Sequence, residues 1–112
     1  MNEKEFNKYL NRDGGCVHCG QAVGVVPHHR LNRGMGGSRE RDTPANIVSL
    51  CSIVNGLVES DSRWYQAALL NGWKLRSGQE PSVTPIWYAY DGKWFLLDDK
   101  MNKVETSPPS RD

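Results

Sequence analysis

The chain has no long apolar run, no large excess of charge of either sign and few cysteines. Its longest apolar stretches, such as residues 22–26, are far shorter than the roughly 20 residues that cross a bilayer, which excludes a membrane-spanning helix. The first ten residues mix both charge signs without an apolar core, which argues against a secretory signal and predicts a cytoplasmic protein. Three cysteines in such a chain do not suggest a disulfide framework, so metal or thiol chemistry becomes the question.

The length and net charge of the chain further narrow the classes of protein to which it could belong. A length of 112 residues is typical of one domain, and a net charge of +1 is too small for attraction of the whole surface to nucleic acid. Positive charge is concentrated locally instead. Residues 28–41 carry four arginines and one glutamate, a local net charge of +3.

The pattern of apolar and turn residues predicts an α+β fold. We expect one domain over residues 1–99, with a C-x2-C knuckle at its N-terminal end, a ββα core over 16–60, a second helix and a β-hairpin over 85–98. Residues 100–112, rich in polar residues and ending near two prolines, are expected to be disordered.

Individual elements follow from local signals. The expected elements are a short helix ending at Asp13-Gly14-Gly15, a strand over 22–26 running into Pro27, a loop over 31–46, a strand over 47–50, helices over 52–60 and from Asp61 or Ser62 to Asn71-Gly72, and a hairpin turning at Asp91-Gly92. We expect the first of the two later helices to face inward with Ile53, Leu57 and Val54, and the second with Trp64, Ala68 and Leu69.

The middle of the chain holds the residues that could take part in catalysis or bind a metal ion. A strand ending in His28-His29 leads into a glycine- and arginine-rich loop, then a strand that opens at Asn46, then a helix with Asn55 in its first turns. A metal nuclease on such a ββα unit needs an imidazole to take a proton from water, a group that fixes it, and ligands for a divalent ion.

The chain resembles the small phage-encoded HNH endonucleases of the ββα-metal superfamily. The resemblance lies in HHR-x2-RGMGGS from His28 to Ser38, in N-x3-LC from Asn46 to Cys51, and in the hairpin that ends with W-x2-LDD at Asp99. These motifs extend over about three-quarters of the chain, and the RGMGGS run is more specific than an H-N-H spacing alone.

The resemblance implies a role for each matching position. His29 corresponds to the general base, His28 to a metal ligand, and Asn46 to the loop-bracing asparagine that holds the backbone or ring of His29. Asn55 lies nine residues after Asn46, where relatives usually have a second metal-ligating histidine. An H-N-N version exists among working relatives, and the harder amide oxygen favours Mg²⁺ or Mn²⁺ over Zn²⁺ or Ni²⁺.

The cysteines depart from the family pattern. Relatives commonly carry C-x2-C twice and bind a structural zinc, whereas here Val54 stands at the fourth cysteine position, which leaves Cys16, Cys19 and Cys51. The fourth ligand of a Zn²⁺ ion could be His18, a water molecule or absent, although a zinc site with an open position is usually catalytic.

Arginines beside the two histidines suggest contacts with DNA phosphates, because guanidinium groups bind phosphate oxygens bidentately. The candidates are Arg30, Arg33, Arg39 and Arg41. Glu59 lies one helical turn after Asn55 and could bind water or metal, but a solvated glutamate is the simpler interpretation.

Two functions fit these residues. The first is a metal-dependent DNA endonuclease that leaves 5′-phosphate and 3′-hydroxyl ends. The resemblance further implies that it nicks or cuts DNA during phage genome packaging in the bacterial cytoplasm, with terminase proteins as partners. The second is a DNA-binding module that keeps the fold but has lost turnover through Asn55 and the incomplete cysteine set. The joint presence of His28, His29 and Asn46 favours the enzyme.

Overall fold

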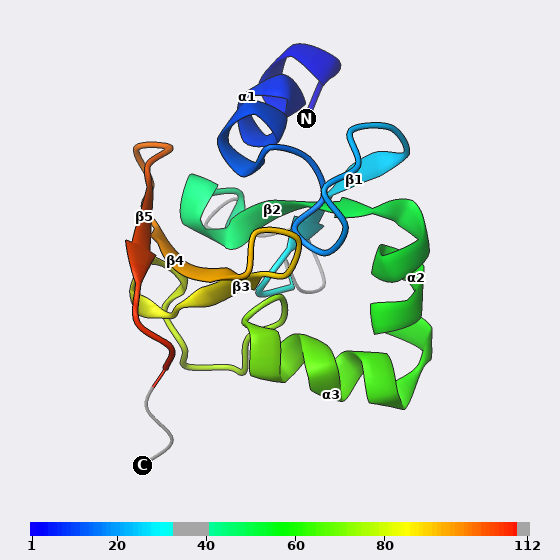
Figure 1. Cartoon of the computed structure of the whole chain (residues 1–112), viewed down its shortest axis with the longest axis vertical. Coiled ribbons are helices and arrows are strands. Elements are labelled where there is room, and N and C mark those ends of the chain that lie inside the picture. Colours follow the sequence, from blue (N-terminus) through cyan, green and yellow to red (C-terminus); the bar gives the residue numbers. More distant parts are fainter. Residues whose placement is uncertain (33–40, 110–112) are drawn as a thin grey trace.

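The computed structural model describes residues 1–32 and 41–109, which form a small α+β fold with three α-helices and two small antiparallel sheets. Figure 1 shows how the helices and strands are arranged. In chain order the elements are α1 (Glu3–Asp13), β1 (Val25–His29), the 3-10 turn η2 (Pro44–Asn46), β2 (Ile47–Cys51), α2 (Ser52–Ser60), α3 (Ser62–Asn71), the 3-10 turn η3 (Pro81–Val83), β3 (Ile86–Tyr88), β4 (Lys93–Leu97) and β5 (Lys103–Thr106).

The ends of the helices follow the local signals. The Asn2 side chain caps α1 by accepting from Glu5 N, and Gly14 ends the helix in the left-handed conformation. Asp61 accepts from the backbone at the start of α3, and Gly72 ends that helix with a φ of 75°. A side chain at Gly72 would also meet the carbonyl of Pro85 at 2.3 Å, so only glycine fits there. The predicted helix limits at Asp13-Gly14 and at Asp61 to Gly72 are confirmed.

The inward face of α2 differs from the prediction. Val54 is buried as predicted and Leu57 is half-buried, whereas Ile53 is 73% exposed and Val58, which was not predicted, is buried. The helix begins directly after β2 with Cys51 as its N-cap, and this junction sets which face turns toward the core. In α3, the prediction holds for Ala68, which is fully buried, and Trp64 packs against the core at its edge.

The first sheet pairs β1 with β2 in antiparallel register, from Val25 opposite Cys51 to His29 opposite Ile47. The first strand therefore starts three residues later than predicted and contains both histidines. The cause is Gly24, which has a φ of 73° and accepts a hydrogen bond from Ser52 N through its carbonyl, so that regular pairing starts only at Val25. Strand β2 leads straight into α2, which gives the order β, β, α along the chain (Figure 1).

The second sheet has the order β3-β4-β5. The predicted hairpin of β3 and β4 is present, with Trp87 opposite Trp94. The expectation of disorder from residue 100 is wrong for Lys103–Thr106, which pair with β4 as β5. Asp98 reverses the chain before β5 by accepting from the backbone of Lys100 and Asn102, a turn that composition alone does not reveal.

A buried carboxylate joins α1 to both sheets. Asp13 is 0% exposed and accepts from Arg12, from Ser49 N in β2 at 2.8 Å and from the Tyr88 hydroxyl in β3 at 2.5 Å. The Tyr90 hydroxyl donates to the backbone carbonyl of Asp13. Burial and the nearby Asp13 charge raise the pKa of Tyr88, so its hydroxyl stays protonated and continues to donate.

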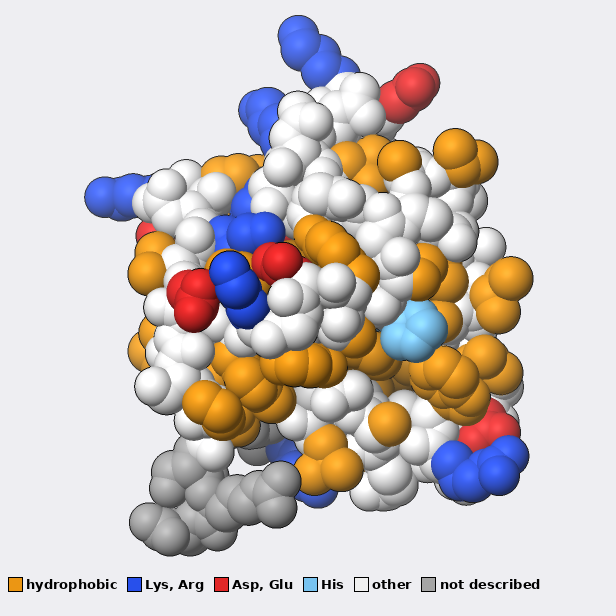
Figure 2. Space-filling view, viewed as in Figure 1, with side chains coloured by type: hydrophobic (Ala, Val, Ile, Leu, Met, Phe, Trp, Pro, Cys, Tyr) orange, Lys and Arg blue, Asp and Glu red, His pale blue; other side chains and the backbone are white. Residues whose placement is uncertain are grey.

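Within residues 1–32 and 41–109, no helix is both long and apolar enough to cross a membrane. The face of the molecule in Figure 2 carries Lys and Arg side chains at several separated points, some of them beside acidic groups.

We expect Tyr88→Phe to lower the free energy of unfolding by about 1.5–3 kcal/mol, because it removes a hydrogen bond to a buried carboxylate. Tyr90→Phe is the matched control, because its hydroxyl bonds to a neutral carbonyl, and should cost about 0.5–1.5 kcal/mol. Urea unfolding of both variants checks the difference. Equal losses of unfolding free energy in the two variants would contradict the larger contribution that we assign to the bond between Tyr88 and the Asp13 carboxylate.

Candidate functional site

His28 and Asn55 form the centre of the site. His28 lies on β1, is 3% exposed and faces α2, where its Nδ1 lies 2.9 Å from Asn55 Oδ1. Its Nε2 lies 2.8 Å from the backbone carbonyl of Trp73. A carbonyl can only accept, so in the neutral ring Nε2 carries the proton, and Nδ1 and Asn55 Oδ1 then face each other as two lone-pair donors, an approach that a cation bound by both atoms would stabilise. The structure thus brings together two residues that are 27 positions apart in the sequence.

The chemistry of this pair suits a divalent cation. Burial lowers the pKa of His28, and the charge of Lys74 lowers it further, so that the ring is neutral at neutral pH. Adjacent ligands in an octahedron with bonds of about 2.1 Å are roughly 3 Å apart, which matches the 2.9 Å between Nδ1 and Oδ1. The carbonyl that holds Nε2–H is the usual support for a metal-ligating histidine. Both side chains therefore fit the role of metal ligands.

An ion pair lies beside these two ligands. Lys74 Nζ lies 2.7 Å from Glu59 Oε1 and 2.6 Å from Asn32 Oδ1, and the lysine side chain is only 5% exposed while that of Glu59 is 54% exposed. The sequence-based interpretation of Glu59 as a solvated residue therefore omits its main partner. Lys74 itself was not predicted, because it follows α3 in a segment without a recognisable motif and reaches Glu59 only through tertiary packing.

His29 points away from His28, because neighbouring residues of a strand face opposite sides. Its Nε2 lies 2.7 Å from Asp42 Oδ1, and its side chain is 26% exposed. A recess of about 400 Å³ beside this pair is also lined by Tyr9 and Lys8 of α1. Asp42 was not among the predicted residues. It fixes the tautomer of His29, since a carboxylate accepting from Nε2–H leaves Nδ1 as the basic nitrogen.

Asn46 braces the loop, although not through His29. Its side chain is 1% exposed, accepts from Leu31 N at 2.8 Å and donates to the carbonyls of Leu31 at 3.0 Å and Arg41 at 2.8 Å. In place of the expected contact with the His29 backbone or ring, its side-chain partners thus lie on both sides of residues 33–40. Those residues lie outside the described part of the chain.

Arg30 is a structural residue, and its prediction as a DNA-phosphate ligand is wrong. It is 0% exposed, and its guanidinium donates to the carbonyls of Gly72, Ala45, Pro81 and Thr84 at 2.8–3.0 Å. A phosphate cannot reach it without unfolding this region. Arg41 is partly exposed, and the predicted phosphate ligands Arg33 and Arg39 lie outside the described residues.

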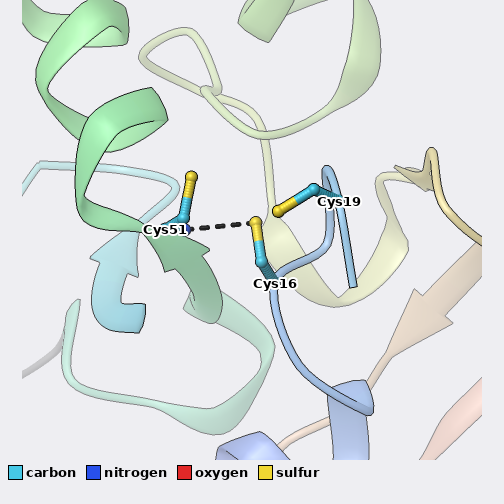
Figure 3. Close-up of side chains that lie close together, drawn as sticks. All are labelled: Cys16, Cys19 and Cys51. Carbon is cyan, nitrogen blue, oxygen red and sulfur yellow. Dashed lines mark hydrogen bonds between the residues drawn. The ribbon is translucent and has the colours of Figure 1, made fainter. Parts of the chain in front are cut away.

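The three cysteines form a second cluster. Cys16 and Cys19 from the knuckle and Cys51 from the end of β2 place their sulfur atoms within 4.8 Å of one another (Figure 3), and they could hold a metal ion such as zinc. Cys16 Sγ accepts from the backbone N–H groups of Cys51 at 3.1 Å and His18 at 3.3 Å.

His18 is not part of the cysteine cluster. Among the described His, Cys, Asp and Glu residues, only Cys16, Cys19 and Cys51 converge there. The ring of His18 instead packs edge-on against Trp64 and Trp73, with centroid distances of 5.6 and 5.7 Å. In the conformation described, His18 is therefore outside the cluster, although its buried Nδ1 has no hydrogen-bond partner among the described residues.

The comparisons with known proteins add no relative: no protein-family model, no curated protein and no solved structure matches the chain.

We expect at most one tightly bound zinc ion per chain, held by the three cysteines and lost in the Cys16→Ser, Cys19→Ser double variant. Val54→Cys adds a fourth thiol at the C-x2-C spacing from Cys51 and should slow zinc removal by a chelator at least about tenfold, because it closes the coordination shell. Elemental analysis and chelator competition measure both effects. Zinc retained in the double serine variant would place the ion elsewhere.

His28 should make the metal-free protein less stable in acid. Its folded pKa lies below the ordinary 6.5, so below about pH 6.5 the unfolded chain takes up a proton that the folded chain does not. The free energy of unfolding should then fall with decreasing pH by up to about 1.4 kcal/mol per pH unit, and His28 should contribute no slope above that pH. In EDTA, His28→Gln should flatten the acid slope and leave the slope from pH 7.5 to 8.5 unchanged. An unaltered acid slope would contradict this.

Proposed function

We propose that this protein is a metal-dependent DNA endonuclease of the HNH type, with β1, β2 and α2 as its ββα core. The observation that supports this most directly is the 2.9 Å approach of His28 Nδ1 to Asn55 Oδ1, two uncharged ligands held on a strand and a helix. The bracing of both loop ends by Asn46 supports the same assignment.

The ion we propose for this pair is Mg²⁺ or Mn²⁺. An amide oxygen is a hard ligand, and two protein ligands leave most of an octahedron open for water and for oxygens of the scissile phosphate. When bound, the ion supplies charge neutralisation at that phosphate and at the departing 3′ oxygen. A structural Zn²⁺ ion at Cys16, Cys19 and Cys51 is proposed separately, because thiolates favour softer ions.

His29 is the general base in this proposal. Its Nδ1 takes a proton from a water molecule, and the oxygen of that water forms a bond to phosphorus in line with the 3′ oxygen. The bond between phosphorus and the 3′ oxygen breaks, the 3′ oxygen takes a proton from solvent, and the products carry 5′-phosphate and 3′-hydroxyl ends. Asp42 holds the ring proton on Nε2, so that Nδ1 carries the lone pair of the neutral ring, and its charge stabilises the imidazolium that forms when Nδ1 takes the proton. Because His28 and His29 face opposite sides of β1, the phosphate has to lie across the end of this strand, with the base on one side and the metal ligands on the other.

DNA binding in this proposal relies on charge in the loop rather than on readout of bases. Arg33, Arg39 and Arg41 remain the proposed phosphate ligands, and so small a domain leaves little surface for base recognition. Cutting or nicking during phage genome packaging, with terminase proteins as partners, is supported by the resemblance of the motifs around His28 and Asn46.

A DNA-binding module without turnover is the second candidate. Lys74 favours it, because an ammonium group beside two uncharged ligands opposes the binding of a divalent cation. A plasmid-nicking assay separates the candidates: the enzyme relaxes supercoiled DNA in Mg²⁺ or Mn²⁺ and is inactive in EDTA, whereas the module only shifts DNA mobility.

We expect His29→Ala to reduce the nicking rate by about 10² to 10⁴, because it removes the base, while DNA affinity in a mobility-shift assay stays close to that of the unaltered protein. Asp42→Asn should give a smaller loss, because the imidazole remains. Equal losses of nicking and binding in His29→Ala would contradict the assignment of the base.

A further inference from the structure

The ion pair of Lys74 and Glu59 has no part in the proposed chemistry, yet it lies beside the metal ligands. Glu59 is one helical turn after Asn55 on α2, and Lys74 directly follows Trp73, whose carbonyl holds His28. The backbone of Lys74 is fixed, since its N–H donates to Ala68 O and the next residue donates to Arg30 O. The ammonium group is therefore held at the site by the fold.

The formal charges beside the candidate metal site sum to zero, but they do not act equally on it. His28 and Asn55 are uncharged ligands, and the negative charge of Glu59 is neutralised by Lys74 at 2.7 Å. The Lys74 side chain is 5% exposed and that of Glu59 is 54% exposed, so water screens the carboxylate more than the ammonium group and the net field of the pair within the buried site is positive. A divalent cation approaching Nδ1 meets the same unfavourable field.

A DNA phosphate changes this balance. A phosphodiester brings a negative charge and oxygen ligands to the open positions of the ion, and Mg²⁺ in proteins is commonly completed by substrate phosphates. The ammonium group has three donors, of which Glu59 and Asn32 take two, and it attracts the same phosphate. Lys74 therefore opposes the cation when DNA is absent and favours DNA when it arrives.

We propose that Lys74 guards the His28–Asn55 site, so that a divalent metal ion binds appreciably only together with a DNA phosphate. This inference rests on the proposed function, because it concerns the same metal site. Lys74 is then a positioning residue that couples the binding of the metal ion to the binding of DNA. Such coupling is reciprocal, so DNA raises the affinity for the metal ion by the same factor by which the metal ion raises the affinity for DNA.

The test is Mn²⁺ binding, measured by electron paramagnetic resonance of the free ion, with and without a short DNA duplex. Mn²⁺ is chosen because the thiolate cluster favours softer ions. All variants carry His29→Ala, so that the duplex stays intact during the titration. Lys74→Met removes the charge and keeps most of the side-chain volume, while Lys74→Arg keeps the charge and is the matched control.

Without DNA, Lys74→Met should bind Mn²⁺ at least about tenfold more tightly than the parent, since one nearby positive charge is gone and Glu59 becomes available to the ion. The enhancement by DNA should shrink correspondingly. Lys74→Arg should behave as the parent. A gain of affinity is a result that structural damage cannot produce. Unchanged Mn²⁺ affinity in Lys74→Met would overturn the guarding role.

Two further variants complete the test. If Lys74→Met does not fold, Glu59→Gln asks the same question from an exposed position: it leaves the Lys74 charge unopposed and should weaken Mn²⁺ binding without DNA and enlarge the enhancement by DNA. No change in either would overturn the proposal. Asn55→Ala should abolish Mn²⁺ binding in every background. If it does not, the metal site, and with it the proposed function, fails independently of Lys74.

Discussion

The guanidinium of Arg30 is the interaction on which the geometry of the site depends. It is buried without a carboxylate partner among residues 1–32 and 41–109, and it holds four carbonyls that come from the end of α3, from η2 and from the segment of η3. Burial lowers its pKa to about 10, so it remains charged at neutral pH. Because the carbonyl of Arg30 also accepts from Leu75 N, this residue fixes Trp73 and Lys74 relative to His28.

The two candidate metal centres meet at the junction of β2 and α2. Cys51 ends the strand and caps the helix, and Asn55 lies four residues later on that helix. A metal ion bound by the thiolates would therefore anchor the first turn of α2 and hold Asn55 toward His28. Metal binding at the three cysteines would therefore affect the geometry of the His28–Asn55 site, although the two sets of ligands select different ions.

Local signals in the sequence were sufficient to predict the caps at Asp61 and Gly72 and a hairpin that turns near Asp91-Gly92, although β3 ends at Tyr88 rather than Tyr90. The expected pairing of His28 with Asn55 came from the resemblance of the motifs and not from a local signal. Non-local effects could not be predicted in the same way. Arg30 belongs to a basic cluster, and nothing in the sequence distinguishes an arginine that binds buried carbonyls from one at the surface. The pairing of β5 and the contact of Lys74 with Glu59 likewise depend on segments that only the complete fold brings together.

Strand β5 lies at the edge of its sheet and pairs with the backbone of β4, whose Phe95 and Leu97 are buried. Its own residues include Lys103 and Glu105, charged side chains of the kind that prevent two sheets from joining edge to edge. The polar composition of residues 100–112 suggests that the chain could be shortened at Asp99. Such a truncation would expose the backbone of the apolar strand β4. The short terminal strand thus protects solubility as well as completing the fold, and self-association would be the first consequence of its loss.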